Sequence, residues 1–251
     1  MKFTENAKII STECIDTGIY SMWLQTENIA LNAKPGQFIS VYSDDGSRLL
    51  PRPISICEAQ ETRLRIVYRV VGKGTEEFSG KSAGDTLRIL GPLGNGYELK
   101  GKKAILFGGG IGIPPMLELA KRLDCEKSIV LGYRDSLFLN EEFEKYGRVY
   151  IATEDGSIGT KGNVIDCVAQ ENITGDVIYA CGPMPMLRAI KQYAEKNDIE
   201  AYISLEEKMA CGVGACLACV CKTKEKDHHS NVNNARICAD GPVFNAKEVE
   251  I

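Results

Sequence analysis

The sequence lacks the segments that mark membrane and secreted proteins. No stretch approaches the roughly 18 to 20 consecutive apolar residues that span a bilayer as a helix. The first residues, MKFTENAKIISTECI, do not contain the apolar core that a signal peptide needs. We therefore expect a cytoplasmic protein that makes no contact with a membrane.

The sequence also lacks basic runs, internal repeats and low-complexity segments. Its formal net charge is −4, so no electrostatic feature favours binding to nucleic acid. With 251 residues, of which 44% are hydrophobic and 25% charged, the composition is that of an ordinary globular protein. This length is sufficient for two domains and a small additional block.

Cysteine, in contrast, is abundant: the chain has ten. In a reducing compartment so many cysteines are not expected to form a disulfide framework, and close spacing indicates metal or redox chemistry instead. Four of them lie within thirteen residues, MACGVGACLACVC, at 209–221. This run is the first candidate functional site.

The chain divides into three blocks by its hydrophobic pattern. Residues 1–98 contain short alternating stretches between turn residues, which predict an antiparallel barrel or sandwich; they are AKIISTECI, GIYSMWLQT, GQFISVYS, RLRIVYRVV and DTLRILGPLG. In residues 99–203, apolar runs such as KKAILFGGGIG and KSIVLGYR alternate with helical stretches such as PPMLELAKRL. That alternation predicts a parallel sheet with crossover helices. Residues 204–251 form a third block, which holds the cysteine run.

The cysteine run has the spacing of a redox cluster. Cys211, Cys216 and Cys219 stand as C-x4-C-x2-C, and Cys238 follows, which is the plant-type pattern of a [2Fe–2S] cluster. The intervening residues GVGA are small, so a loop could wrap a cluster and direct backbone N–H groups toward its sulfides. Structural zinc sites usually contain two short cysteine pairs, so the spacing favours iron–sulfur over zinc. Spacing alone leaves the fourth ligand open between Cys238 and Cys221.

Two adjacent histidines, His228 and His229, would also allow a Rieske-like centre. They lie in the hydrophilic stretch KTKEKDHHSNVNN, for which a solvated loop is the favoured interpretation.

Two turns in the second block follow predicted strands. LFGGGIGIPPM, 106–116, leads from a strand into a helix with Pro114 or Pro115 in its first turn, and YACGPMPML occupies 179–187. Turns at the carboxyl edge of a parallel sheet bind nucleotides in doubly wound folds. The first turn departs from the usual dinucleotide fingerprint because its third glycine position is Ile113. Either turn, taken alone, could be no more than a tight corner.

The first block contains RPISI at 52–56 and IVYRVVGKGT at 66–75. Arg52 could offer a bidentate fork to a diphosphate, and Ser55 could hydrogen-bond the edge of a flavin ring. Gly74 and Thr75 could donate to phosphate from the backbone and a hydroxyl. The pattern alone allows equally a surface arginine and a hairpin turn.

In their order along the chain, RPIS, YRVVGKGT, GPLGNGY, GGGIGIPPM and CGPMPML resemble motifs of the ferredoxin–NAD(P) reductase superfamily. With the cysteine block and ICADGPVF added, the whole chain is similar to the electron-transfer subunits of B-type dihydroorotate dehydrogenases. The resemblance implies an oxidoreductase subunit with an N-terminal antiparallel FAD-binding barrel (1–98), a parallel-sheet NAD-binding domain (99–203) and a small C-terminal [2Fe–2S] domain (204–251). It suggests no catalytic acid, base or nucleophile for dihydroorotate in this chain.

The resemblance also assigns residues to each cofactor. For FAD it implies Arg52, Pro53, Ile54, Ser55, Val67, Tyr68, Arg69, Gly74 and Thr75. For the nicotinamide it implies Gly108, Gly109, Gly110, Gly112, Cys181, Gly182, Pro183 and Met184. For the cluster it implies Cys211, Cys216, Cys219 and Cys238, although the polar insert before the last of these is long.

A nicotinamide exchanges two electrons as a hydride and a [2Fe–2S] cluster exchanges one, so a flavin must stand between them. We expect electrons from dihydroorotate, oxidised on a separate FMN-containing catalytic subunit, to pass through the cluster and FAD to NAD in pyrimidine biosynthesis. The resemblance implies a heterotetramer of two copies of each chain. The residues leave the choice between NAD and NADP open, because Arg134 suits the 2′-phosphate of NADP and Asp135 suits a ribose hydroxyl of NAD. The resemblance favours NAD.

Two alternative functions stay open from the residues. One is an NAD(P)H-oxidising electron-transfer subunit of a related complex, of the ferredoxin:NADP oxidoreductase or sulfhydrogenase type. The other is a non-enzymatic zinc-binding interaction module.

Overall fold

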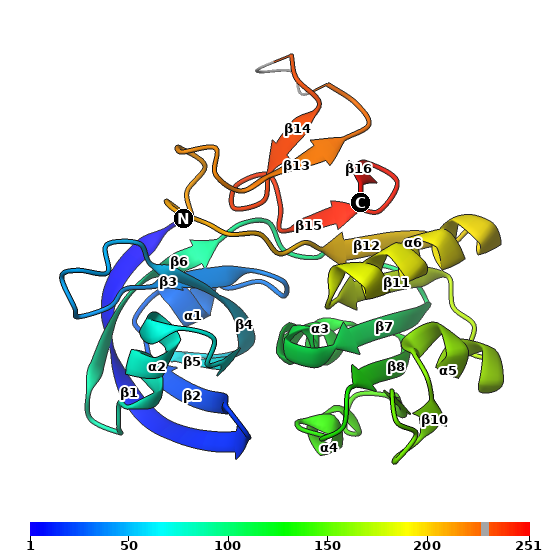
Figure 1. Ribbon diagram of the computed structural model, residues 1–251, viewed down its shortest axis with the longest axis horizontal. Helices are drawn as coiled ribbons and strands as arrows, with labels where there is room; N and C mark the ends of the chain where they lie inside the picture. The colour runs from blue at the N-terminus through cyan, green and yellow to red at the C-terminus, as the bar shows by residue number, and fades with distance from the viewer. Residues whose placement is uncertain (227–230) are drawn as a thin grey trace.

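The structure is a computed structural model that describes residues 1–226 and 231–251 (Figure 1). His228 and His229, and with them the Rieske-like interpretation, lie outside the described residues. The first block is a closed antiparallel barrel with the strand order β1-β2-β5-β4-β3-β6. Its strands are β1 (Phe3–Asp16), β2 (Ile19–Gln25), β3 (Phe38–Val41), β4 (Arg52–Gln60), β5 (Arg63–Arg69) and β6 (Thr86–Leu93), with the short helices α1 (Ile29–Asn32) and α2 (Lys73–Ser79).

The alternating pattern predicts five of these strands and misses β4. Along most of a barrel strand one face is buried and the other is solvated, which produces alternation. In β4 the consecutive residues Cys57, Glu58 and Ala59 are all buried, because a helix of the second block covers the outer face of the strand. The alternation is therefore lost where the two blocks meet.

The second block is a seven-stranded sheet in the order β10-β9-β8-β7-β11-β12-β15. All neighbouring pairs are parallel except β12 with β15, so the predicted parallel sheet is confirmed. Its strands are β7 (Lys103–Gly109), β8 (Glu126–Tyr133), β9 (Arg148–Thr153), β10 (Thr160–Lys161), β11 (Val177–Cys181), β12 (Glu200–Ser204) and β15 (Val243–Asn245). Its helices are α3 (Pro114–Arg122), α4 (Asn140–Phe143), α5 (Val164–Gln170) and α6 (Met184–Asn197), with a 3-10 turn, η1 (Gly110–Gly112), before α3.

The third block lies across the upper ends of the other two in Figure 1. Strands β13 (Val220–Thr223), β14 (Asn234–Arg236) and β16 (Val249–Glu250) form a small sheet in the order β14-β13-β16. Strand β15 leaves this block and extends the sheet of the second block by pairing with β12. The third block is thus hydrogen-bonded into its neighbour, and the domain boundaries at residues 98 and 203 stay predictions.

Buried polar contacts fix the barrel against the second block. The Glu118 carboxylate on α3 is 1% exposed and accepts the Ala59 backbone N–H at 3.1 Å. Arg65 on β5 makes a bidentate pair with Glu142 on α4, with N–O distances of 2.6 and 3.0 Å, and donates to Ser21 at 2.9 Å. These contacts position α3 and the turn before it beside β4 and β5 (Figure 1).

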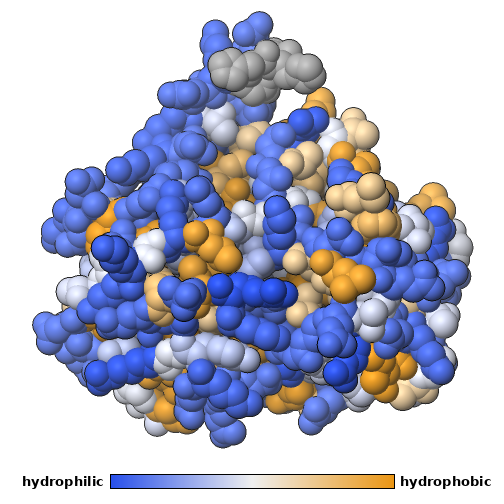
Figure 2. Space-filling view, turned by 180° about the vertical axis from the view of Figure 1, so that it is seen from behind, coloured by the Kyte–Doolittle hydropathy of each residue, from blue (hydrophilic) through white to orange (hydrophobic). Residues whose placement is uncertain are grey.

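Seen from behind, the surface is predominantly hydrophilic, with apolar side chains in small separate patches (Figure 2). Within residues 1–226 and 231–251, no helix has the length and apolar character needed to cross a membrane.

Candidate functional site

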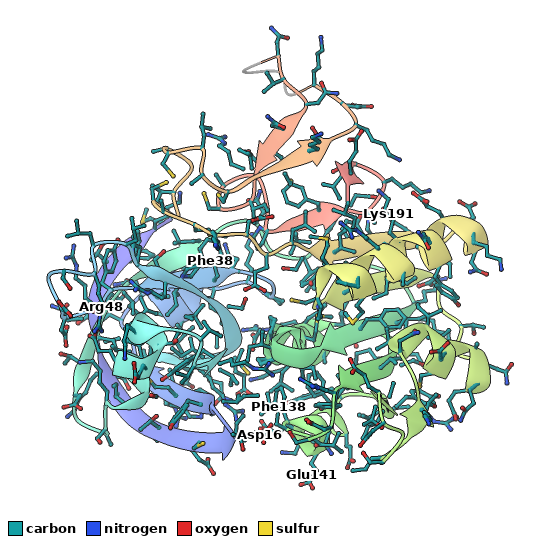
Figure 3. The ribbon with its side chains drawn as sticks, viewed as in Figure 1. Asp16, Phe38, Arg48, Phe138, Glu141 and Lys191 are labelled. Atoms are coloured by element: carbon teal, nitrogen blue, oxygen red, sulfur yellow. The ribbon has the colours of Figure 1, made fainter. Side chains whose placement is uncertain are left out.

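The register of β3 against β4 decides which way the RPIS motif faces. Pro53 is paired with Ser40 and Ser55 with Phe38, and residues directly opposite in an antiparallel pair point to the same face. Phe38 belongs to the hydrophobic cluster that contains the C-terminal cysteines, so this is the outer face of the barrel. Phe38, labelled in Figure 3, lies where the barrel meets the third block. Ile54 of the motif faces inward and packs on the barrel core.

Arg52 lies directly over Gly74 at the start of α2. A Cβ added to Gly74 would lie 2.2 Å from Arg52 Nε and 2.6 Å from Cζ, so only glycine leaves room for the guanidinium. The same guanidinium donates to the Leu50 carbonyl. The structure therefore brings two predicted flavin-site residues, one from β4 and one from α2, into contact.

Thr75 shapes the loop before α2. Its hydroxyl accepts the backbone N–H groups of Val71 and Gly72, at 2.9 and 3.2 Å, and donates to the Gly72 carbonyl at 2.9 Å. Because the hydroxyl is buried and its proton is used within the loop, Thr75 holds the loop in shape. Its contact with FAD stays a prediction.

The three residues predicted on β5 have different surroundings. Val67 packs in the hydrophobic cluster shared with the second block, and Arg69 is exposed. Tyr68 is 2% exposed and stacks on Tyr20 with ring centroids 6.1 Å apart. Its hydroxyl has no hydrogen-bond partner among the described residues, and burial raises the pKa of Tyr68. An unsatisfied buried hydroxyl costs about 1–3 kcal/mol, so this group suits a polar ligand such as a flavin.

The two turns predicted for the nicotinamide lie side by side. Strands β7 and β11 are neighbours, with Cys181 opposite Gly108, so both turns emerge at the carboxyl edge of the sheet as predicted. A Cβ on Gly112 would lie 2.5 Å from the Cys181 carbonyl oxygen, and one on Gly182 would lie 2.4 Å from Met186 Cε. Glycine at position 112 is thus needed for the close approach of the turns, whereas the atom nearest to a Cβ on Gly182 is the end of the flexible Met186 side chain.

The remaining residues of these turns complete the corner. Gly109 would meet Met186 with any Cβ, and Gly110 has a φ of +51°, a conformation that favours glycine. Pro183 caps α6, which begins at Met184, and α3 begins at Pro114. Burial raises the pKa of Cys181 to about 12, so its thiol is neutral. The contacts of these residues with a nicotinamide stay predictions.

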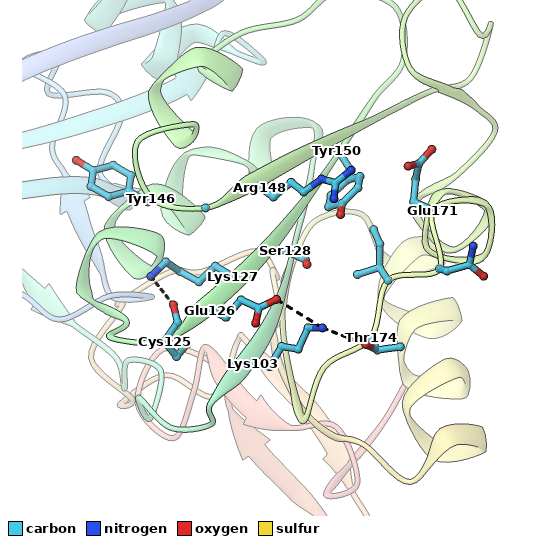
Figure 4. A pocket seen from close by; sticks show the side chains of 13 residues that line it. Lys103, Cys125, Glu126, Lys127, Ser128, Tyr146, Arg148, Tyr150, Glu171 and Thr174 are labelled. Carbon is cyan, nitrogen blue, oxygen red and sulfur yellow. Dashed lines mark hydrogen bonds and ion pairs between the residues drawn. The ribbon is translucent and has the colours of Figure 1, made fainter.

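A cavity of about 470 Å³ lies at the opposite edge of this sheet (Figure 4). It is lined at the amino ends of β7, β8 and β9 by residues such as Lys103, Glu126 and Arg148. Nucleotides bind at carboxyl ends in such folds, and none of the predicted site residues lines this cavity. It therefore does not mark the cofactor site.

The four predicted cluster ligands form two pairs. Cys211 and Cys216 stand at the two ends of the first loop and form one pair, and Cys219 and Cys238 form the other, in which the Cys238 backbone N–H donates to Cys219 Sγ. Cys219 and Cys238 are buried, whereas Cys216 is exposed. We call residues 211–219 the cluster loop.

Backbone N–H groups favour the thiolate of Cys211. Partial burial raises the pKa of Cys211. Hydrogen bonds from the backbone N–H groups of Val213, Cys216 and Ala215 lower this pKa by more, to about 6. The N–H groups of Val213 and Ala215 point at Cys211 Sγ from 3.4 and 3.3 Å. Gly212 makes this curl possible with its φ of +68°. These N–H groups point at the cysteine sulfur, and their predicted approach to the sulfides of a cluster stays a prediction.

The second pair lies deeper. Burial and the neighbouring Cys219 raise the pKa of Cys238 to about 12, and the Cys238 backbone N–H donates to Cys219 Sγ at 3.4 Å. Cys221 differs, because it lies on β13 opposite Ala235 and belongs to neither pair. This arrangement agrees with Cys238, and not Cys221, as the fourth ligand.

The arrangement in pairs fits a binuclear cluster. In a [2Fe–2S] centre two protein ligands bind each iron, which divides four thiolates into two pairs. The donor set is all thiolate, with N–H donors to the sulfurs, so the residues present fit the iron–sulfur group.

Sequence reasoning missed the residues that hold the cysteine segments together. Arg236 makes a bidentate pair with Asp240, both N–O distances being 2.9 Å, and donates to the Gly214 carbonyl at 3.2 Å. Asn95 donates to the Asp240 carbonyl at 2.9 Å and ties the segment after Cys238 to the barrel. The motif GPLGNGY contains Asn95, but only the fold shows its partner.

Comparison with known proteins adds to this geometry. The sequence model of the iron-sulfur cluster binding domain of dihydroorotate dehydrogenase B matches residues 206–250. The electron transfer subunit of dihydroorotate dehydrogenase B (NAD(+)) from Caldanaerobacter subterraneus subsp. tengcongensis is 42% identical over 251 residues, covering 99% of each chain. The corresponding subunit of Bacillus velezensis is 43% identical and covers 93% of each chain.

Solved structures agree. The NADH-dependent reduced ferredoxin-NADP oxidoreductase structure matches with a TM-score of 0.88 and 29% identity, covering 100% of this chain and 91% of that chain. A ferredoxin NADP+ reductase from Neisseria gonorrhoeae with bound FAD and NADP matches in fold alone, with a TM-score of 0.64 and 18% identity, over 77% of this chain and 91% of that chain.

Barrel, parallel sheet and cysteine block together define an electron-transfer subunit of an oxidoreductase, of the ferredoxin reductase type, that uses FAD, an iron–sulfur cluster and NAD. More particularly, the chain belongs to the family of electron transfer subunits of dihydroorotate dehydrogenase B (NAD(+)). Membership in this family implies a catalytic partner subunit, and it replaces the interpretation as a zinc-binding module.

Proposed function

We propose that this chain carries electrons from dihydroorotate, oxidised on a partner flavoprotein, to NAD. In the proposal the thiolates of the two cysteine pairs hold the cluster, β4, β5 and the start of α2 hold FAD, and the turns after β7 and β11 hold the nicotinamide. The bound groups supply the redox chemistry: single electrons at the cluster, one or two at the flavin and a hydride at the nicotinamide. The protein supplies binding, orientation and spacing.

The observation that carries the proposal is the order of these three regions around the barrel. The cluster loop lies on the outer face of β3, and β4 with its RPIS motif is the next strand. On the other side of β4, strand β5 contacts the turn η1 of the nicotinamide region. The flavin strands therefore lie between the cysteine pairs and the nicotinamide turns, which is the order that the electron count requires.

For the partner we propose an FMN-containing catalytic subunit in a complex of two copies of each chain. The side chains of Val213 and Leu217 in the cluster loop are 38% and 64% exposed, although both are apolar. Apolar side chains beside a redox centre suit a docking surface, so we place residues 212–218 at or near the interface with the partner.

The test uses the holo chain with and without a dihydroorotate-oxidising flavoprotein. Alone, the chain should oxidise NADH with artificial acceptors and show no dihydroorotate activity. Mixed with the partner, it should couple dihydroorotate oxidation to NAD reduction in a complex whose mass corresponds to two copies of each chain. Leu217→Asp should weaken the complex, whereas Ile158→Asp should not, because Ile158 is in the loop before β10, and β10 lies at the lower right of Figure 1, away from the third block.

A second function is favoured by the 29% identical oxidoreductase structure: an NAD(P)H-oxidising subunit of a ferredoxin:NADP oxidoreductase or sulfhydrogenase complex. It predicts the same NADH oxidation by the isolated chain. It predicts no coupling to dihydroorotate in the mixture. Absence of coupling with flavin and iron intact would thus favour this alternative.

A further inference from the structure

We propose that Ser40 on β3 is a positioning residue that sets the distance between the cluster loop and the flavin-binding strand β4. This inference rests on the proposed function and concerns how the chain spaces its two redox sites. Ser40 lies in the predicted strand GQFISVYS but in none of the motifs assigned to a cofactor.

The contact itself is buried and tight. Ser40 is 1% exposed. Among the described residues and apart from its chain neighbours, a Cβ on Gly212 would meet only Ser40 Oγ at 2.7 Å and Leu93 Cδ1 at 3.6 Å within 4 Å. Because 2.7 Å is too short for a carbon–oxygen contact, a Cβ at position 212 would force either the loop backbone or the buried Ser40 hydroxyl to move.

The position of Ser40 relates this contact to the flavin motif. Ser40 is paired with Pro53 of RPIS, and paired residues share a face of the sheet. Neighbouring strands lie about 4.8 Å apart. Gly212 follows the proposed cluster ligand Cys211 directly. The contact of Gly212 with Ser40 therefore lies one strand spacing away from the flavin motif.

The rest of the cysteine block is held by other contacts. Asn95 binds the Asp240 carbonyl, and Phe38 packs in the same hydrophobic cluster as Cys219 and Cys238. A change at Gly212 should therefore move the Cys211 side of the loop and leave the Cys219–Cys238 pair in place. Since electron transfer between two centres slows exponentially with their separation, such a shift should alter the rate of transfer without releasing either cofactor.

The experiment compares two rates after anaerobic mixing of the holo chain with NADH. Flavin reduction is followed by bleaching, and cluster reduction by the paramagnetic signal of freeze-quenched samples. In molecules that hold iron, Gly212→Ala should slow cluster reduction several-fold, while flavin reduction stays at the wild-type level. The double variant Gly212→Ala/Ser40→Ala should restore the rate, because it removes the Ser40 Oγ atom that lies 2.7 Å from the new Cβ.

A matched control separates this contact from backbone strain. Gly18 has a φ of +69°, against +68° at Gly212, and a Cβ there would meet no described residue within 4 Å. Gly18→Ala should leave both rates unchanged. Equal slowing in Gly18→Ala, or equal rates in the single and double Gly212 variants, would overturn the role of Ser40.

If Gly212→Ala fails to hold iron, Ser40→Thr decides the question from the barrel side, because it adds a methyl group without changing the cluster loop. A wild-type rate of cluster reduction in Ser40→Thr would overturn the inference. Failure of the wild-type chain to pass electrons from NADH to the cluster at all would refute the proposed function instead.

Discussion

Replacing Gly74 with alanine should separate the stability of the barrel from its affinity for FAD. The three atoms nearest to a Cβ at this position all belong to the Arg52 side chain, the closest at 2.2 Å. A long side chain can turn away where backbone could not, so the barrel need not deform. Gly74 lies within α2, where alanine is favoured over glycine by about 1 kcal/mol. The free energy of unfolding of the cofactor-free protein should therefore stay unchanged or rise by up to about 1 kcal/mol.

The affinity for FAD should change in the opposite direction. In the proposed site the Arg52 guanidinium binds the diphosphate, and a charge-assisted hydrogen bond contributes about 1.5–3 kcal/mol. Displacing the guanidinium should thus weaken FAD binding by about ten- to hundredfold. Arg52→Ala should give a loss of the same size, because both changes remove one interaction.

The assay is calorimetric titration of the cofactor-free variants with FAD, together with urea denaturation of the same proteins. In the Arg52→Ala background, Gly74→Ala should cost little further affinity, since the group that it displaces is already gone. An equal loss in both backgrounds, or an unchanged affinity in Gly74→Ala, would refute the reasoning. An unchanged affinity in Arg52→Ala would remove Arg52 from the flavin site.

Three further predictions concern the cluster, the contact between the blocks and the loop beside α2. Serine substitution at each proposed ligand should remove iron and the paramagnetic signal of the reduced protein, and Cys221→Ser should spare both. If Cys221→Ser loses the cluster and Cys238→Ser retains it, the assignment is wrong. Glu142→Gln leaves the largely buried Arg65 without its bidentate partner. We therefore expect thermal and urea denaturation to show that the free energy of unfolding falls by about 1–3 kcal/mol. An unaltered free energy of unfolding would argue against a role for this pair. Partial burial acts to raise the pKa of Glu77, but hydrogen bonds from Ser43 and Asp44 and the charge of Arg48 outweigh it and lower this pKa below 4.5. A carboxylate whose pKa is lower in the folded state than in the unfolded state stabilises the protein at pH values above the unfolded-state pKa, and this stabilisation is lost as the pH falls through the folded-state pKa. Glu77→Gln should therefore be less stable than wild type at pH 7, and the difference should vanish in acid. A difference that persists below the folded-state pKa would contradict this origin.

Much of the fold was predictable because its signals are local. Period-two alternation marks the barrel strands wherever one face is solvated, and KKAILFGG followed by PPMLELAKRL marks a buried strand and its crossover helix. The same reasoning missed β4, because α3 covers its outer face and removes the alternation. It also missed α5 and β12, because their apolar patterns are short and only their packing in the sheet identifies them as a helix and a strand.

The features of the candidate site likewise divide into those that local sequence determines and those that depend on the tertiary structure. The sequence by itself determined which residues can ligate or cradle a cofactor, since thiolate spacing, a proline-flanked arginine and glycine turns are chemical properties of short segments. Only the tertiary structure decided how these segments lie relative to one another. The contact of Gly212 with Ser40, the approach of Gly112 to Cys181 and the fit of Arg52 over Gly74 join residues that are 22 to 172 positions apart. Their physical origin is close packing between separately formed elements, and no local pattern encodes it.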